Sequence, residues 1–196
     1  MKRVPIVPTI IVLLAVAYMV HLGFWQLQRL GEKEAMLARY AAAQASGEDV
    51  RWPETPAMAE RAFYHRSRLD CRSATGETTL SGRNAKGEAG LAHVATCIDA
   101  EGGARQIVLG WSRDPSAAVW TGGVVTGWIA PGPRLVADPP LAGLEANARP
   151  DPRDIPNNHL AYAVQWFLFA GVALVIYALA LRKRTRERAP RQDGLP

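Results

Sequence analysis

The chain has 196 residues, of which 48% are hydrophobic, and its mean hydropathy is −0.06. That average is typical of a soluble domain, but the apolar residues gather near the two ends, so we predict a membrane protein. The formal net charge is +5, and residues 1–28 and 182–196 together carry eight basic and two acidic residues. The segment between them has 15 basic and 16 acidic residues, so it offers no nucleic-acid-binding footprint.

The first apolar run extends from Ile6 to Leu22 behind Lys2 and Arg3. A basic start, an apolar core and an Ala-Val-Ala triplet are typical of a cleavable signal peptide. Against cleavage, hydrophobicity persists past the triplet, and Trp25 stands where an interfacial aromatic closes a full span. An uncleaved N-terminal transmembrane helix over residues 1–29 is therefore the preferred prediction.

The second apolar run, Leu160 to Leu181, contains one strongly polar side chain, Gln165, and ends at three consecutive basic residues. A spanning helix needs about 20 mostly apolar residues at a rise of about 1.5 Å, so residues 156–182 are predicted to cross the bilayer. Residues 183–196 then form a basic cytoplasmic tail. The positive-inside rule puts both termini in the cytoplasm of a multi-pass protein. The absence of an Arg-rich, Ser-rich presequence favours a bacterial inner membrane, with a periplasmic central domain.

His159 stands at the entrance of this second helix, after Pro156 and two asparagines. Proline is tolerated at or before a first helical turn and asparagine caps it, so the imidazole lies at membrane-interface depth. Helical spacing puts Tyr162, Ala163 and Trp166 on the same face. The imidazole either sits among lipid headgroups or serves as axial ligand or hydrogen-bonding partner of a flat cofactor.

A second cluster, Gly23, Trp25, Gln26 and Arg29, lies at the outer end of the first helix, level with His159. One interpretation is an interfacial belt, with tryptophan at the headgroups and arginine reaching for phosphate. The other is a single site shared by both helices, in which Trp25 and Arg29 lie one turn apart and Gly23 allows a close neighbouring backbone.

The run Gly23-Phe24-Trp25-Gln26-Leu27-Gln28-Arg29-Leu30 resembles the opening motif of the surfeit-locus family of cytochrome c oxidase assembly proteins. The run Asn157-Asn158-His159-Leu160-Ala161-Tyr162-Ala163, followed by Trp166-Phe167, is similar to the closing motif of that family. The two motifs are also at the right distance from each other, in a two-helix frame.

The resemblance implies a membrane factor that matures the terminal oxidase and is associated with insertion of haem a. It implicates the second-helix histidine, here His159, in holding haem, so His159 is the expected metal ligand of transiently bound haem a. The remaining expected haem contacts are Trp25, Gln26, Arg29, Tyr162 and Trp166. The implied partners are the oxidase catalytic subunit and the machinery of haem a synthesis, besides the lipid bilayer. The alternative is a scaffold that stabilises an oxidase subunit without binding haem.

Residues 30–155 are predicted to form a periplasmic β-rich domain with a helical extension. The helix continues over residues 30–40, and residues 41–56 read as a linker pinned by Trp52-Pro53. Short strand-like runs cover residues 64–71, 91–98, 106–111 and 123–129, with Gly76 and Gly82 among the turn signals. An antiparallel sheet or small barrel follows, and residues 131–156, with seven prolines, return as an extended segment. The fold class is thus membrane α+β, with two transmembrane helices flanking an antiparallel β-rich domain.

Cys71 and Cys97 are the two cysteines of the chain, and both fall near the ends of strand-like runs. In an oxidising compartment a disulfide between them closes a loop of about 26 residues and contributes about 3 kcal/mol. The alternatives are that the cysteines are copper or haem ligands, that they are a free pair of buried thiols, or that they form a metal cluster with His65 and His93.

We predict that the protein is not an enzyme. Ser112, His93 and Asp114 match no hydrolase motif, and the chain contains no nucleophile elbow, phosphate loop or zinc-protease helix.

Overall fold

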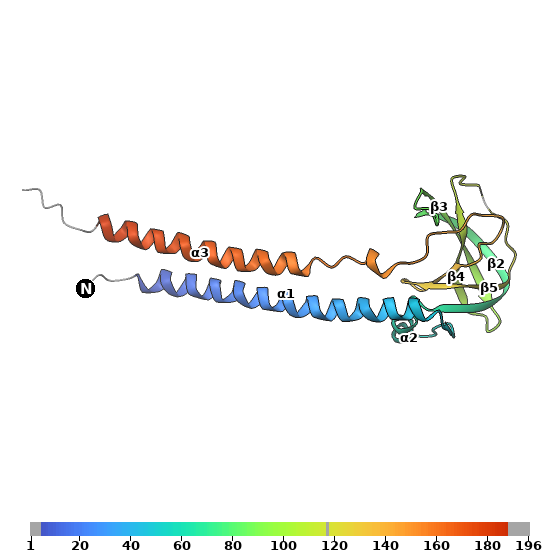
Figure 1. Cartoon of the computed structure of the whole chain (residues 1–196), viewed down its shortest axis with the longest axis horizontal. Coiled ribbons are helices and arrows are strands. Elements are labelled where there is room, and N and C mark those ends of the chain that lie inside the picture. The colour runs from blue at the N-terminus through green and yellow to red at the C-terminus, as the bar shows by residue number, and fades with distance from the viewer. Residues whose placement is uncertain (1–4, 117, 188–196) are drawn as a thin grey trace, which may run out of the picture. The chain divides into compact units, whose positions relative to one another are not determined.

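The computed structural model describes residues 5–116 and 118–187, so most of the predicted basic tail, residues 188–196, lies outside the described residues. The chain divides into two units. A helical unit comprises residues 1–35 and 156–196, and a sheet unit comprises residues 36–155. Every β-strand belongs to the sheet unit (Figure 1).

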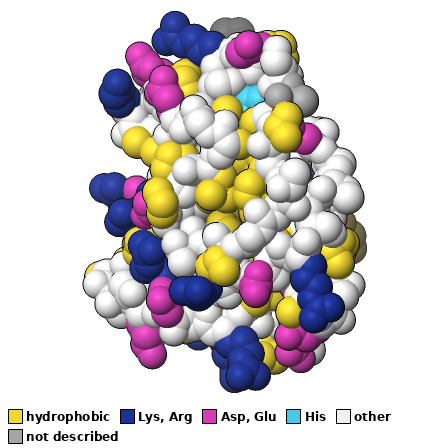
Figure 2. Space-filling model, turned by 90° about the vertical axis from the view of Figure 1, so that its right-hand side faces the viewer, with side chains coloured by type: hydrophobic (Ala, Val, Ile, Leu, Met, Phe, Trp, Pro, Cys, Tyr) yellow, Lys and Arg dark blue, Asp and Glu magenta, His cyan; other side chains and the backbone are white. Residues whose placement is uncertain are grey.

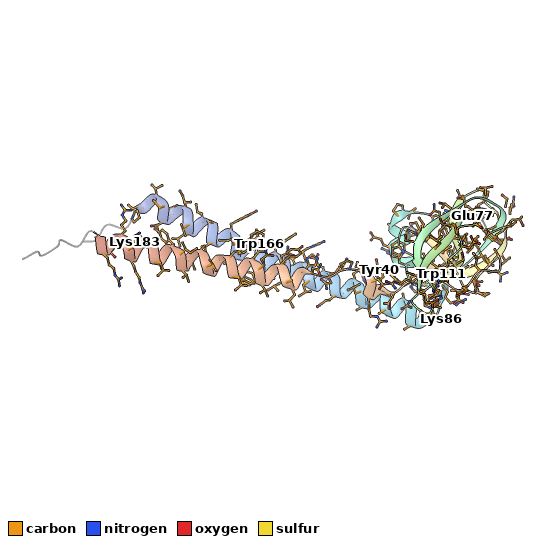
Figure 3. All side chains as sticks on the ribbon, turned by 90° about the horizontal axis from the view of Figure 1, so that it is seen from above. Tyr40, Glu77, Lys86, Trp111, Trp166 and Lys183 are labelled. Atoms are coloured by element: carbon orange, nitrogen blue, oxygen red, sulfur yellow. A yellow bond between two sulfur atoms is a disulfide. The ribbon has the colours of Figure 1, made fainter. Side chains whose placement is uncertain are left out.

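Helices α1 (Ile6–Ser46) and α3 (His159–Glu187) are the two elements long and apolar enough to cross a membrane. In the helical unit they lie side by side in two perpendicular views (Figures 1 and 3). Most of their apolar side chains are exposed, as expected of surfaces that face lipid. The two predicted transmembrane helices are therefore present as helices, with bounds that extend beyond the apolar runs.

The prediction of a linker over residues 41–56 is wrong at both ends. Helix α1 continues to Ser46 because residues 41–45 are mostly alanine, the strongest helix former, and it stops at Gly47 with φ +61°. Strand β1 (Asp49–Val50) follows, and helix α2 (Pro56–Ala62) starts behind Thr55, whose side chain accepts a hydrogen bond from the amide of Met58. The predicted pinning of this segment is confirmed, since Trp52 is buried in the sheet core.

Five strands of the sheet unit pair in a closed ring, β2-β3-β4-β6-β5 and back to β2. Residues 66–71 of β2 pair with β5, whereas residues 71–83 pair with β3. The strands are β2 (Arg66–Arg83), β3 (Ala89–Asp99), β4 (Ala104–Ser112), β5 (Gly123–Ala130) and β6 (Arg134–Ala137). The ring is the small barrel that the sequence left as an alternative to an open sheet.

The purely antiparallel sheet of the prediction is wrong, because β4 pairs with β6 in parallel and β1 pairs with β2 in parallel. A ring of five strands cannot alternate direction at every step, since an odd number of alternations does not return to the starting direction. One parallel pair is therefore unavoidable once β5 closes on β2, and it falls between β4 and β6. Strand β6 also lies inside the segment 131–156, which was predicted to return to the membrane as an extended segment.

Strand β2 is 18 residues long, and the predicted turn signals Gly76 and Gly82 lie inside it. Gly76 has φ +61° and sits at the register irregularity between Thr75 and Thr78, where glycine allows the backbone to bulge. Gly76, which was predicted to mark the end of a strand, therefore bends a continuous strand, and β2 pairs with both β5 and β3.

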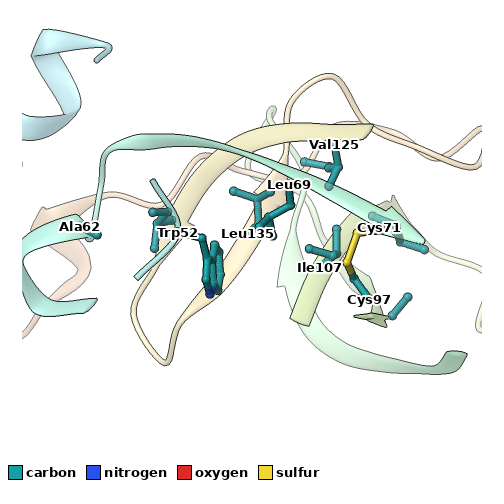
Figure 4. Close-up of a cluster of buried hydrophobic side chains, with 12 residues drawn as sticks. Trp52, Ala62, Leu69, Cys71, Cys97, Ile107, Val125 and Leu135 are labelled. Atoms are coloured by element: carbon teal, nitrogen blue, oxygen red, sulfur yellow. A yellow bond between two sulfur atoms is a disulfide. The ribbon is translucent and has the colours of Figure 1, made fainter. Parts of the chain in front are cut away.

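Cys71 and Cys97 form a disulfide, with a Cα–Cα distance of 5.4 Å. Both sulfurs lie in the hydrophobic core beside Leu69, Ile107 and Val125 (Figure 4). The bridge stands where β2 passes from β5 to β3, because Cys71 is opposite Gly123 on one side and Asp99 on the other. The predicted disulfide is confirmed, and the alternative of two cysteine ligands is wrong because both sulfurs are bonded.

Candidate functional site

His159 is the first residue of α3, as its neighbours in the sequence predict. Pro156 precedes the helix, and the backbone carbonyl of Asn158 accepts the hydrogen bond of the Tyr162 amide, which makes Asn158 the cap position. The His159 side chain is half-buried, and its Nδ1 lies 2.7 Å from Oε1 of Gln26 on α1. The two predicted clusters, 133 residues apart in the chain, therefore meet in a direct hydrogen bond.

This bond determines the tautomer of the imidazole. An amide oxygen only accepts hydrogen bonds, so Nδ1 of His159 is the donor to Gln26. In a neutral imidazole the other nitrogen, Nε2, then carries the lone pair. The arrangement leaves Nε2 able to coordinate a metal while the hydrogen bond from Nδ1 to Gln26 orients the ring, as hydrogen-bonding partners of metal-ligating histidines do.

About one turn before Gln26 on α1, at Gly23, helices α1 and α3 approach each other closely. A Cβ at that position would lie 2.5 Å from Cε1 of Phe167, so no side chain fits without moving the ring. Phe24 meets the same ring edge-on, with 5.4 Å between centroids, and Ala163 is buried. Gly23 therefore allows close packing as predicted, although its neighbour is an aromatic ring rather than a backbone.

Within the described residues, neither Trp25 nor Arg29 has a hydrogen bond with His159, which bonds Gln26. Consecutive residues of a helix are about 100° apart, so Trp25 points away from the side on which Gly23 meets Phe167, and it is 47% exposed. Arg29 Nη1 lies 2.5 Å from Oε2 of Glu32 in an exposed ion pair.

The two aromatic candidates of α3 differ in their surroundings. Tyr162 is half exposed, whereas Trp166 (Figure 3) packs edge-on against Phe169 with 6.1 Å between centroids. Sequence reasoning treated Asn157 only as a cap. Its Oδ1 is in fact buried and has no hydrogen-bond partner among the described residues, so it is an acceptor that lacks a donor two residues before His159.

A second polar cluster, in the sheet unit, was missed from the sequence. The fully buried His93 contacts Glu77 through Nδ1 at 2.7 Å and Ser112 through Nε2 at 2.9 Å. The carboxylate of Asp114 is not part of this cluster: it accepts a hydrogen bond from the Ser116 hydroxyl, which holds the pKa of Asp114 below its usual range. Alternation within β3 and β4 could have paired His93 with Ser112, but Glu77 lies within the register irregularity of β2 between Thr75 and Thr78.

The hydroxyl of Ser112 in this cluster is not an activated nucleophile. It donates to the Asp114 carbonyl at 2.6 Å and accepts from the Asp114 amide at 3.1 Å. His93 Nε2 must therefore donate to Ser112, the reverse of what a general base does. Glu77 also accepts from the amide of Ala118, so the cluster ties the loop after β4 to the barrel.

Acidic and basic side chains are interspersed on the face of the molecule shown in Figure 2, around hydrophobic side chains near its centre.

No group of three or more His, Cys, Asp or Glu that could hold a metal occurs in residues 5–116 and 118–187. His65 and His93 are therefore not joined in a Cys/His metal cluster, since both cysteines form the disulfide.

A family model described as the SURF1 family matches residues 13–171, which include both motifs and the His159–Gln26 contact. The chain belongs to the SURF1 family. This family is associated with assembly of cytochrome c oxidase, and it is a family of assembly factors rather than a known class of enzyme. Oxidase partners and membrane association follow for this SURF1 protein from the family and the two apolar helices. No curated protein sequence matches the chain.

Proposed function

We propose that this SURF1 protein binds haem a transiently through His159 and assists its insertion into the catalytic subunit of cytochrome c oxidase. The observation that supports the proposal is the hydrogen bond from His159 Nδ1 to Gln26. It leaves Nε2 with a lone pair, and a neutral imidazole nitrogen is a common axial donor to haem iron. Haem is here the cargo, and the chain supplies the donor and its orientation.

Four other side chains of the helical unit fit such a cargo. Arg29 already holds a carboxylate, that of Glu32, and the pair is exposed, so a propionate of the same charge can replace Glu32 at little cost. The unpartnered Oδ1 of Asn157 offers a buried acceptor near the imidazole. Tyr162 and Trp166, on the same side of α3 as His159, supply aromatic surface for a flat macrocycle.

The alternative function is a scaffold that contacts an oxidase subunit without binding haem. Trp25 favours it, because this exposed aromatic of the opening motif faces away from α3 and is free to meet another membrane protein. The absorption spectrum of the protein purified from cells that make haem a separates the two functions. A haem band supports binding, and its absence supports the scaffold.

The proposed role of Gln26 gives a direct test. Gln26→Leu removes the acceptor of the Nδ1 proton, so the ring loses its orientation and the haem affinity should fall about 10- to 100-fold, as it does when outer partners of metal ligands are removed. Titration of the purified variant with haem, followed by the Soret band, measures the change.

Gln28→Leu is the matched control for that experiment. Gln28 is the same residue type on the same helix, but its amide donates to Glu32 at 3.0 Å and does not touch His159. Its replacement should leave haem affinity within about twofold, the usual result for an exposed position. Equal affinities of Gln26→Leu and wild type would contradict the role of Gln26.

We also propose that both termini are cytoplasmic and that residues of about 30 to 155 are periplasmic in a bacterial inner membrane. Positive charge flanks the outer ends of both apolar runs, and the positive-inside rule then sets the orientation. A reporter active only in the periplasm should work when fused after Asp138 and fail when fused after Gly194. The opposite pattern of activity would reverse the orientation.

A further inference from the structure

Two side-chain hydrogen bonds join α1 and α3 in the described residues: Gln26 with His159, and the hydroxyl of Thr9 with that of Tyr177. His21 on α1 and Gln165 on α3 are exposed and have no hydrogen-bond partner among the described residues. Both lie within the apolar runs, where water is absent and an unpaired polar group is costly.

His21 and Gln165 lie on opposite outer faces of the helix pair. His21 precedes the buried Gly23 by two residues, and Gln165 follows the buried Ala163 by two, so each points about 160° away from the interface between α1 and α3. A second polar group, the hydroxyl of the exposed Tyr18, lies one turn from His21 on the same face of α1. These groups cannot reach each other within one chain.

The two side chains also lie at the same depth. Relative to the Gln26–His159 bond, His21 is five residues along α1, about 7.5 Å, and Gln165 is six residues along α3, about 9 Å. Copies of the chain related by an axis along the membrane normal keep equal depths. His21 of one copy and Gln165 of the next therefore lie level whenever these two faces meet.

We infer that this protein forms a head-to-tail oligomer in the membrane, in which the outer face of α1 packs on the outer face of α3 of a second copy. His21 then bonds Gln165, the same pairing of imidazole and amide that joins His159 to Gln26 inside one chain. A heterologous contact of this kind repeats, because each copy keeps one face of each type open. The inference does not depend on haem binding, since it uses neither His159 nor Gln26.

Cross-linking between two tagged forms tests the contact. One form carries His21→Cys, the other Gln165→Cys, and both are made together as full chains and oxidised in native membranes. The native cysteines are joined to each other and do not interfere. We expect a cross-linked dimer that contains both tags.

Val164→Cys paired with His21→Cys is the matched control. Val164 has the depth of Gln165 and is 50% exposed, but it lies about 100° away around α3, so its cross-link should be several-fold weaker. The inference is overturned if both pairs cross-link equally, if neither does, or if the products are dimers with a single tag or adducts with another protein.

Self-association in vesicles gives a second measurement. His21→Leu should weaken energy transfer between labelled copies about three- to tenfold in dissociation constant, which is the range for one interhelical hydrogen bond. Exchanging the two residues, His21→Gln with Gln165→His, should restore it. Unchanged association of His21→Leu, or failure of the exchange to restore it, would contradict the pairing.

Discussion

On the proposed haem-binding role, replacing His159 by alanine will remove haem binding and abolish oxidase maturation while the protein stays in the membrane. The side chains of the next turn, including Tyr162 and Ala163, provide no nitrogen donor that can replace the imidazole. The loss of affinity should exceed the about 10- to 100-fold expected for the outer partner Gln26. Insertion will persist because it depends on the apolar run from Leu160 to Leu181. The haem spectrum and oxidase activity of the membranes measure the two effects.

Two controls make this result specific. Leu160→Ala changes the neighbouring residue, which is 55% exposed and about 100° around the helix, and should leave the haem spectrum unchanged. Free imidazole, added to the His159→Ala protein, should restore part of the haem band because it fills the space with the same donor. Full haem content with an unaltered spectrum in His159→Ala would exclude axial ligation and leave the scaffold function.

Cys71→Ser will lower the free energy of unfolding of the sheet unit by about 3 kcal/mol. The bridge closes a sequence separation of 26 residues, and its loss restores the conformational entropy of that loop to the unfolded chain. The full chain in detergent can be unfolded with urea and followed by the fluorescence of its tryptophans. The midpoint should move to a lower urea concentration.

The double variant Cys71→Ala with Cys97→Ala and the wild type with dithiothreitol are the controls, because both lack the cross-link. Their unfolding midpoints should be similar, because the two samples differ only in whether the two side chains carry sulfur atoms. Mass spectrometry of a non-reducing digest should show the two cysteine peptides joined. Two thiols that are freely alkylated without reductant would refute the disulfide.

The two clusters that contribute to the candidate site could be located from the sequence because each of them is local. His159 follows a capping sequence, and the opening motif lies one helix length from the N-terminal charges, so both clusters could be assigned to the same depth. Helical periodicity cannot say which residue of one helix meets which residue of the other. The structure selects Gln26 for His159, directs Trp25 outward and pairs Arg29 with Glu32.

The sheet unit shows why the barrel could not be derived in the same way. Strands β3, β4 and β5 were predicted to within about two residues because each is a short run of β-formers between turn signals. Gly76 gives the same local signal whether it ends a strand or bulges one, and only pairing of β2 with both β5 and β3 decides between these.

The two membrane helices, their polar entrances and the family motifs follow from local residue patterns, because hydrocarbon requires about 20 consecutive apolar residues and capping residues lie next to the turns they cap. Three other features became known only from the folded chain: β4 and β6 run in parallel, His93 contacts Glu77 and Ser112, and His159 donates to Gln26. Each of these contacts joins segments well separated in the chain. Such contacts depend on closing the barrel and packing the helices, and no local pattern of residues encodes them.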